Sequence, residues 1–253
     1  MDTSTITITF GDVAENHARM QKLGKVAKNG FTVAELIDFQ TKFTSLGCTC
    51  ELVPIPYVSE TGKTEDLQAA VLVIRNGVDA LSNGKSKHMF TELSGLEWDR
   101  KAFMRGRVVN KHARWNLCFG NTPQDPDYIN GKGRIVSYKD VPITKSVHQG
   151  LENVLGEKGK NLVAEGNYYY NVKKCYIGYH GDGERRLVIG VRLGAPFPLH
   201  FQWFFKGEKV GTPYTISLNG GDMYIMSDIA VGWNWLKKNI PTLRHSAGFA
   251  IPG

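Results

Sequence analysis

The chain has 253 residues, with 31 lysine and arginine side chains against 24 aspartate and glutamate side chains, and so a formal charge of +7 at pH 7. Hydrophobic residues make up 42% of the chain and charged residues 22%, which is typical of a globular protein and excludes a wholly disordered chain. The modest cation excess also excludes a histone-like tail. This length predicts one large domain, or one domain with an additional smaller unit.

Targeting and redox signals are weak in this sequence. It contains no run of about 18 apolar residues, and its N-terminal segment lacks the basic start and apolar stretch of a signal peptide. We therefore expect a cytoplasmic or nuclear protein with no membrane partner. The cysteines are too few and too scattered for a disulfide framework, and we expect reduced, mostly buried thiols. They are Cys48, Cys50, Cys118 and Cys175.

The first hundred residues predict a mixture of strands and helices. Residues 5–10 alternate strictly between threonine and apolar side chains, as in a strand with one buried face. Thr32 and Glu35 form a capping-box pattern that opens a helix. No glycine-rich phosphate loop follows any strand here. We expect residues 1–100 to form an α/β annex of unknown role, with strands over 5–10, 50–55 and 69–74 and helices over 12–28 and 32–46.

The remaining residues, 101–253, predict a β-rich domain. Short alternating runs lie between turns rich in Gly, Pro, Asn and Asp, a spacing that indicates a barrel or a sandwich. One helix over 143–155, ended by Gly156, interrupts the strands, and a short helical turn is expected over 233–238 before Pro241. The expected strands cover 133–138, 167–170, 187–193, 200–205, 215–218 and 223–226.

One short motif places an imidazole and a carboxylate where a predicted strand ends. His180 and Asp182 are two positions apart, and residues at i and i+2 lie on the same face of a strand. The two side chains can therefore bind adjacent positions of one cation. A second histidine would complete the two-histidine, one-carboxylate face that binds iron and leaves the opposite face open for a cosubstrate and dioxygen. A His-x-Asp pair alone is weak support, because chance produces it often.

Two histidines downstream of Asp182 are candidates for the third ligand. His200 follows closely, on what should be a neighbouring strand, whereas His245 lies much further along the chain. A late strand that returns beside the strand of His180 needs several strands in between, and only the longer gap supplies them. We expect His180, Asp182 and His245 to be the metal ligands and catalytic residues, with His200 as the alternative.

The residues around this motif resemble the AlkB-like branch of the iron(II)/2-oxoglutarate-dependent dioxygenases. The run 177–185 is similar to that family's Ile-Gly-x-His-x-Asp-x-Glu-Arg signature, and 188–194 is similar to the strand that follows it. Residues 221–227 resemble the strand that precedes the family's last iron-binding histidine. Residues 106–117 occupy the place of its basic upstream segment, with a looser match. The resemblance covers about residues 103–250, with four motifs in the family's order.

This resemblance implies a fold, a metal and a reaction. The fold would be α+β, with a double-stranded β-helix (jelly-roll) core over 101–253 and the α/β annex over 1–100. His180, Asp182 and His245 would hold iron(II), with 2-oxoglutarate as cosubstrate and dioxygen as oxidant. In that family, hydroxylation of an N-methyl group releases formaldehyde, so the implied outcome is oxidative demethylation.

The family also implies residues that bind 2-oxoglutarate upstream of the metal motif. Its Asn-x-Tyr pattern is similar to Asn167-Tyr168-Tyr169, with slightly wider spacing to His180. This match predicts Asn167 and Tyr169 as cosubstrate ligands. An ordinary aromatic strand packed on a sheet explains the same residues equally well.

The arginine clamp of the family has no counterpart at its usual place. Family members hold the distal carboxylate of 2-oxoglutarate with arginines beyond the last histidine, but no basic residue follows His245. We expect Arg192 to take this role, because a guanidinium matches a carboxylate, and a salt bridge at the barrel rim is the alternative for it. Arg244 is the second choice, since strand alternation directs it away from the face of His245.

The substrate is the least determined step. Residues 100–115 interleave arginine and lysine with Phe103 and Trp115, which fits contact with single-stranded or damaged nucleic acid but also fits a solvated face over core residues. Three functions follow: an oxidative demethylase of N-alkylated nucleic-acid bases, a hydroxylase of a protein side chain or small molecule, and an inactive binding module. The first is the favoured interpretation.

Overall fold

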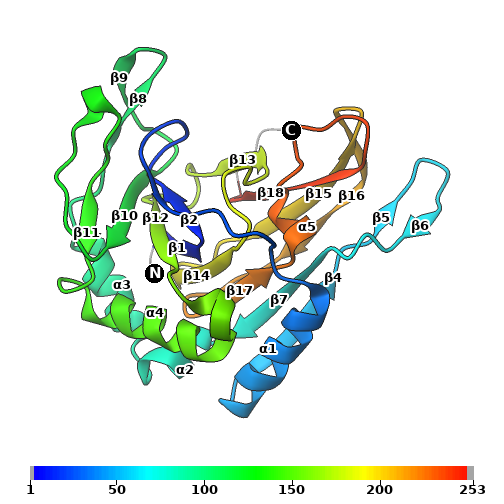
Figure 1. The fold of residues 1–253 in the computed structure, drawn as a ribbon, viewed down its shortest axis with the longest axis horizontal. Helices are drawn as coiled ribbons and strands as arrows, with labels where there is room; N and C mark the ends of the chain where they lie inside the picture. Colours follow the sequence, from blue (N-terminus) through cyan, green and yellow to red (C-terminus); the bar gives the residue numbers. More distant parts are fainter. Residues whose placement is uncertain (1–2, 250–253) are drawn as a thin grey trace.

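The computed structural model describes residues 3–249, and the segment after Phe249, where the sequence offers no C-terminal arginine, lies outside them. Figure 1 shows two sheets and a group of helices. The larger sheet has the order β11 (Ile135–Ser137), β10 (Trp115–Gly120), β12 (Val163–Tyr169), β1 (Thr5–Gly11), β14 (Ile189–Gly194), β17 (Met223–Met226), β7 (Ala70–Arg75), β4 (Thr49–Pro54). The smaller sheet has the order β13 (Ile177–His180), β18 (Thr242–Ala247), β15 (Leu199–Phe205), β16 (Glu208–Ile216).

Besides the two sheets, the structure contains short hairpins and helices. Within the two sheets every pairing is antiparallel except that of β10 with β11. The hairpins are β2 (Val13–Glu15) with β3 (Lys22–Gly24), β5 (Tyr57–Val58) with β6 (Thr64–Glu65), and β8 (Lys101–Met104) with β9 (Arg107–Asn110). The helices are α1 (Val33–Ser45), α2 (Gly77–Ser82), α3 (Ser86–Ser94), α4 (Pro142–Leu155) and α5 (Asp228–Val231), with 3₁₀ turns η1 (Tyr128–Asn130) and η2 (Gly156–Gly159). The α+β class is confirmed.

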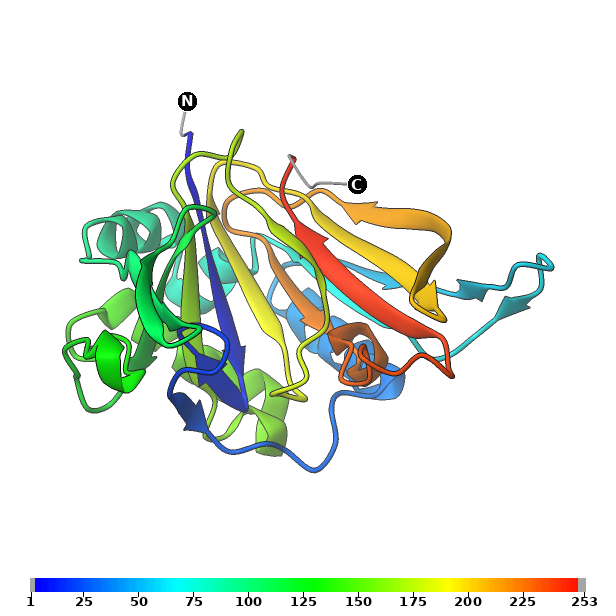
Figure 2. The same ribbon diagram turned by 90° about the horizontal axis from the view of Figure 1, so that it is seen from above.

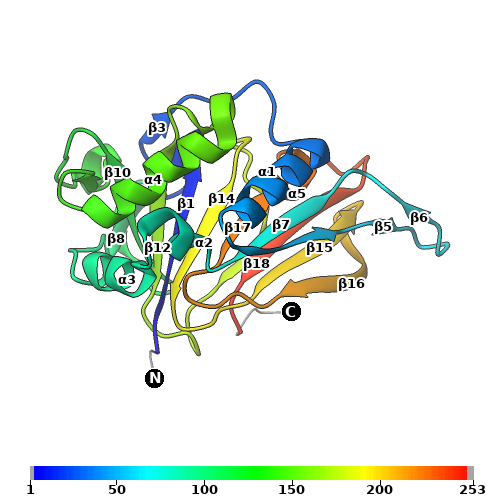
Figure 3. The same ribbon diagram turned by 90° about the horizontal axis from the view of Figure 1, so that it is seen from below.

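Helices α1 to α4 cover one face of the larger sheet, as Figure 3 shows from below. Strand β1 explains how the two faces differ, because its side chains alternate. Ile6, Ile8 and Phe10 are fully buried in the core beneath the helices. Thr7 and Thr9 point to the opposite face and line a cavity. The alternation read from residues 5–10 therefore separates an apolar core from a polar inner surface.

The smaller sheet packs on that inner face only at one end, which Figure 2 shows from above. There, Val71 and Val73 of β7 share a buried apolar cluster with Phe201 and Trp203 of β15 and Leu243 of β18. Toward β14, β1, β12 and β10 the inner face is polar and is not filled by apolar side chains. The two sheets therefore leave a cavity at this end.

The helices expected over 32–46 and 143–155 are confirmed as α1 and α4. The Thr32 hydroxyl accepts from the backbone N–H of Glu35, and the Glu35 carboxylate accepts from the backbone N–H of Thr32. Pro142 begins α4, as its fixed φ angle favours at a first helical position.

The helix expected over 12–28 is wrong, since this segment forms β2, β3 and turns. Asp12 is buried, and its carboxylate accepts hydrogen bonds from the backbone N–H groups of Ala27, Arg186 and Leu187. Such tertiary contacts override helix propensity. The turn expected over 233–238 is found over 233–236 as a non-helical turn, and the short helix α5 lies before it.

Strands from both halves of the chain build the larger sheet. β1 lies between β12 and β14, and β7 and β4 continue the sheet beyond β17. The expected boundary near residue 100 falls between α3 and β8 and does not separate one sheet from another. Among residues 3–249, no helix has the length and apolar character needed to cross a membrane.

Candidate metal centre

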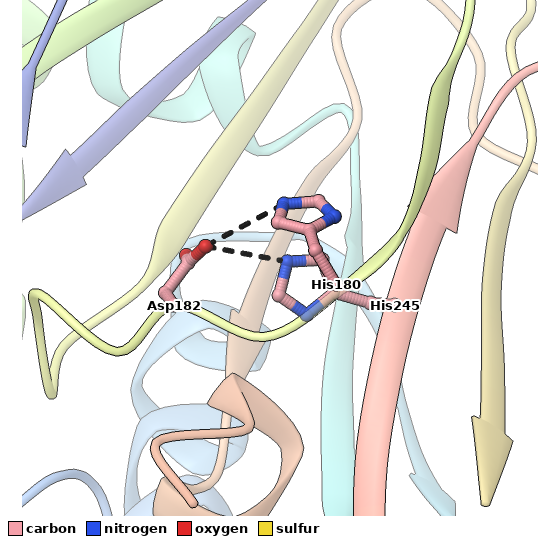
Figure 4. A group of neighbouring side chains, drawn as sticks. All are labelled: His180, Asp182 and His245. Atoms are coloured by element: carbon pink, nitrogen blue, oxygen red, sulfur yellow. Dashed lines mark ion pairs between the residues drawn. The ribbon is translucent and has the colours of Figure 1, made fainter. Parts of the chain in front are cut away.

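His180, Asp182 and His245 point toward one another, as Figure 4 shows, and all three line the cavity. The Asp182 Oδ1 atom lies 3.5 Å from Nε2 of His180 and 3.7 Å from Nε2 of His245. One ligand atom from each residue lies within 4.8 Å of the other two. The three residues that the sequence singled out as metal ligands can therefore hold a metal ion.

Strand pairing and a close backbone contact bring these residues together. His180 ends β13 and pairs directly with His245 of β18. The chain then passes against α5, where the N–H of Asp182 donates to the Val231 carbonyl at 3.0 Å. A Cβ atom on Gly181 would lie 2.3 Å from the Gly232 carbonyl oxygen, so this passage requires glycine. The loop consequently returns the Asp182 carboxylate to the two imidazoles.

The hydrogen bond at Nδ1 of His180 leaves its Nε2 atom available for a cation, and His245 is buried beside it. Nδ1 of His180 lies 2.8 Å from the Gly178 carbonyl oxygen, so it carries the proton and donates. The Nε2 lone pair of His180 then faces Asp182. Burial lowers the pKa of His245 well below its ordinary value, and the adjacent His180 acts in the same direction. His245 is therefore a neutral ligand at neutral pH.

His200, the alternative third ligand, lies away from this centre. Phe201 is the residue of β15 that pairs with His245, so His200 points to the other face of the sheet. Its Nδ1 atom is 2.8 Å from the Thr215 hydroxyl and its Nε2 atom is 3.0 Å from the Gly248 carbonyl oxygen. Both ring nitrogens are thus occupied by local hydrogen bonds.

Arg185 lies behind the aspartate and fixes a group of carboxylates. It is 2% exposed, and its Nη2 atom donates to Glu165 at 2.7 Å and to Glu184 at 2.9 Å. Its Nε atom is 3.7 Å from Oδ2 of Asp182, the oxygen that faces away from the imidazoles. Arg185 therefore orients Asp182 and neutralises the carboxylates beside it. The sequence did not indicate this role for Arg185, although Arg185 belongs to the same motif as His180 and Asp182.

The metal group borders a cavity of about 630 Å³. A row of polar side chains from four adjacent strands lines its inner wall. Arg192 of β14 is in register with Thr7 of β1, Thr7 with Asn167 of β12, and Asn167 with Asn116 of β10. Tyr169, from the same strand as Asn167, is buried and also lines the cavity. No sequence pattern indicated Thr7 and Asn116 as cavity residues, because their place in this row depends on strand pairing.

Arg192 is a fully buried cation that faces this cavity. It donates from Nη1 to the Thr7 hydroxyl, and its carbon Cζ lies 5.1 Å from the ring centre of Phe197. Its Nε atom has no hydrogen-bond partner among the described residues, and none of their carboxylates forms an ion pair with it. Burial lowers the pKa of Arg192. A guanidinium in this position favours an anionic ligand, since unpaired buried charge is costly.

Asn167 has a fixed orientation at the cavity wall. Its Oδ1 atom accepts from Nε of Arg114 at 2.7 Å and from Nδ2 of Asn116 at 2.8 Å. With the oxygen held by two donors, the Asn167 amide nitrogen is free to donate into the cavity. Arg114 is a further residue that the sequence did not single out by itself.

Arg244, the second choice as a ligand for the cosubstrate carboxylate, does not line the cavity. Its guanidinium lies over the Phe204 ring, with Cζ at 3.9 Å from the ring centre, and Nη2 is 3.4 Å from the Trp235 carbonyl oxygen. Adjacent residues of a strand point to opposite faces, and His245 occupies the cavity face. The geometry therefore does not place Arg244 among the residues that line the cavity.

Tyr224 enters the cavity by lying across Gly190 of the neighbouring strand. A Cβ atom at Gly190 would lie 1.9 Å from Cζ of Tyr224, closer than any packed structure allows. We expect Gly190→Ala to lower the free energy of unfolding by about 1–3 kcal/mol through overpacking. Urea unfolding measures this change. Gly95→Ala is the control, since its nearest atom would be 3.6 Å away, and an equal loss in both variants would contradict the packing argument.

The basic segment over 100–115 forms an exposed edge near the cavity. β8 and β9 form a hairpin on which Lys101, Arg105 and Arg107 are exposed. Arg100 lies over the Trp115 ring with Cζ at 4.0 Å from its centre, and the other face of Trp115 stacks on Tyr170 at 4.6 Å. Trp115 therefore has no free face for a nucleic-acid base in this structure.

The fold and site together define a mixed α+β protein with a mostly antiparallel sheet and a His-Asp-His group that can hold a metal ion. No protein-family model matches the chain. It is 50% identical over 245 residues to "Uncharacterized protein R156" of Acanthamoeba polyphaga mimivirus, covering 96% of this chain and 95% of the viral protein. The chain therefore belongs to the same family as this viral protein. The relative's name assigns no activity.

Proposed function

We propose that this protein is an iron(II)/2-oxoglutarate-dependent dioxygenase. The observation that carries the proposal is the position of the His180, Asp182 and His245 group beside a cavity that also holds the unpaired guanidinium of Arg192. Two neutral imidazoles and one carboxylate suit iron(II), and they leave coordination positions for other ligands. A buried cation in the same cavity suits an anionic cosubstrate. The donor set therefore fits both groups.

A double-stranded β-helix, or jelly-roll, core is part of the same proposal. Support comes from the two mostly antiparallel sheets that share a buried cluster, and from the pairing of β13 with β18 at the open end. In such a core, side chains on the inner faces of both sheets line one cavity. β1 would then be an N-terminal addition within the larger sheet.

Each residue of the cavity has a defined task in this proposal. When bound, iron and 2-oxoglutarate supply the oxidising power that inserts oxygen from dioxygen into a substrate C–H bond, with succinate and carbon dioxide as coproducts. His180, Asp182 and His245 hold the metal, and Arg185 keeps the Asp182 carboxylate in place. Arg192 neutralises the distal carboxylate of the cosubstrate, while Asn167 donates to it from the cavity wall.

For the substrate we favour N-alkylated bases of single-stranded or damaged nucleic acid. The exposed cations of the β8–β9 hairpin support this choice, because phosphates provide most of the affinity in such complexes. A protein side chain or a small molecule is the alternative, and a binding module without activity is the third. Each makes a different prediction for the experiment that follows.

The test is succinate release by protein reconstituted with iron(II) under nitrogen and then exposed to air and 2-oxoglutarate. We expect succinate to depend on iron(II) and formaldehyde to appear with a methylated single-stranded oligonucleotide. Oligonucleotide affinity should also fall steeply with salt, by close to one unit of log–log slope for each phosphate contacted. Succinate with a flat salt response favours another substrate. Absence of succinate under all conditions leaves the binding module.

A further inference from the structure

Beside Arg192 and Arg185, the cavity contains the guanidinium of Arg114, which has unused hydrogen-bond donors. Within the described residues this side chain donates one hydrogen bond, from Nε to Oδ1 of Asn167 at 2.7 Å. Its two terminal nitrogens form no hydrogen bond or ion pair with any residue that the structure describes, and Arg114 lines the cavity. An arginine presents five donors in a rigid fork, so most of its binding capacity remains available.

Two further basic side chains, His17 and Lys111, lie near Arg114. Arg114 lowers the pKa values of His17 and Lys111, although burial is the main cause of both shifts and brings that of Lys111 to about 7. Lys111 lies behind the cavity wall, where its Nζ atom donates to Oδ1 of Asn16 at 2.8 Å. The carboxylates of Asp99 and Glu165 also act on Lys111, so both signs of charge are present at this end of the cavity, although none of the described carboxylates forms an ion pair with Arg114.

The carboxylates of the cavity are all engaged elsewhere. Glu165 and Glu184 accept from Arg185, at 2.7 and 2.9 Å. Glu165 also accepts from the backbone N–H of Glu15, and the Glu15 carboxylate accepts from the backbone N–H of Arg19. They form a group around Arg185, apart from Arg114. Residues 3–249 thus supply no counter-ion that forms an ion pair with Arg114.

The two carboxylates of the proposed cosubstrate already have partners other than Arg114. The proposed cosubstrate has two carboxylates, one assigned to the metal and the other to Arg192. Arg192 stands on β14 and Arg114 immediately precedes β10, and β1 and β12 lie between these two strands. Three strand spacings of about 4.8 Å separate their backbones. A diacid held between the metal and Arg192 leaves Arg114 for another ligand.

We infer that Arg114 binds an anionic group of the substrate, a carboxylate or a phosphate, and so determines substrate specificity. This inference rests on the proposed function, because it assigns the rest of the cavity to metal and cosubstrate. The guanidinium forms a bidentate pair with the anion, while Asn167 keeps it in place through Nε. The substrate accordingly carries a negative charge where it lies against Arg114.

The test is calorimetric titration of manganese-loaded protein saturated with N-oxalylglycine, an analogue of 2-oxoglutarate. L-Malate and citrate probe carboxylates, and inorganic phosphate and thymidine 5′-monophosphate probe phosphates. We expect at least one probe to bind, and Arg114→Gln to weaken it at least about tenfold, as expected for lost charge-assisted hydrogen bonds. Arg114→Lys should recover part of this affinity, and both variants should lose much less affinity for N-oxalylglycine than for the probe, because Arg114 acts on the analogue only through Asn167.

Arg100→Gln is the matched control, because the Arg100 guanidinium lies on Trp115 outside the cavity. It should bind each probe like the wild type. The inference is overturned if no probe binds, if Arg114→Gln binds the probes unchanged, or if that variant loses N-oxalylglycine to the same extent. Failure of the wild type to bind N-oxalylglycine counts instead against the proposed function, and the anion titration without it then decides the role of Arg114.

Discussion

Asp182→Ala is expected to lower the affinity for divalent metal at least about 100-fold, since loss of an outer-shell partner alone costs about 10–100-fold. The Asp182 Oδ1 atom faces Nε2 of both His180 and His245, so the carboxylate is the only anion of the group. Without the Asp182 carboxylate, only the two imidazoles remain as ligands, and no negative charge in this group offsets the charge of the ion. Calorimetric titration with manganese(II) or cobalt(II) in the absence of air measures the change.

The fold should survive this substitution, because the backbone N–H of Asp182 keeps its bond to Val231. Retained circular dichroism and unfolding midpoint would establish this. His200→Ala is the matched control, since it removes an imidazole from the same sheet but from its other face. Metal affinity unchanged in Asp182→Ala, or lost in His200→Ala, would contradict the assignment of the centre.

Local signals in the sequence predicted those elements whose cause is local. The capping box at Thr32 and Glu35 forms within four residues, and α1 begins where it indicates. The alternation over 5–10 has the same character, because each side chain's face follows from the strand period. Alternation also separates Arg244 from His245 correctly, and it weakened Arg244 as a cosubstrate ligand from the start.

The cavity wall could not be predicted in this way, because its residues meet through long-range pairing. Thr7 and Arg192 are 185 positions apart in sequence and become neighbours only when β1 enters the sheet beside β14. The strand pattern predicts that β1 exists and does not indicate its partner. Because residues 1–100 were expected to form a separate annex, Thr7 and Thr9 were not predicted to line the cavity. Asn16 was not predicted there either, because residues 12–28 were expected to form a helix.

The metal group was accessible from sequence for a different reason. His180 and Asp182 are close in the chain, so their spacing alone restricts them to one site. His245 required an argument about how many strands separate two neighbours in a barrel, and the direct pairing of His180 with His245 agrees with it. Arg114 offered no comparable signal, because its role depends on which neighbours lack charge.

Arg192→Met is expected to weaken cosubstrate binding strongly without destabilising the protein. Removing one partner of a buried, charge-assisted pair costs about 2–5 kcal/mol in binding. That range corresponds to a loss of N-oxalylglycine affinity of roughly 30-fold or more. Methionine keeps an apolar stem against Phe197 and leaves the His180, Asp182 and His245 group untouched. Metal affinity should therefore stay within a factor of about three, well below the effect of a lost metal ligand.

Stability should respond in the opposite direction to binding. Arg192 is fully buried and has no counter-ion among the described residues, so the ligand-free protein carries the desolvation cost of this guanidinium. Replacing buried charge by an apolar side chain is neutral or stabilising, and we expect the free energy of unfolding to stay equal or rise by about 1 kcal/mol. Urea unfolding with and without N-oxalylglycine measures both effects, because a ligand stabilises only the form that binds it. A strongly destabilised variant would show that Arg192 supports the fold and would remove the main argument for an anionic cosubstrate.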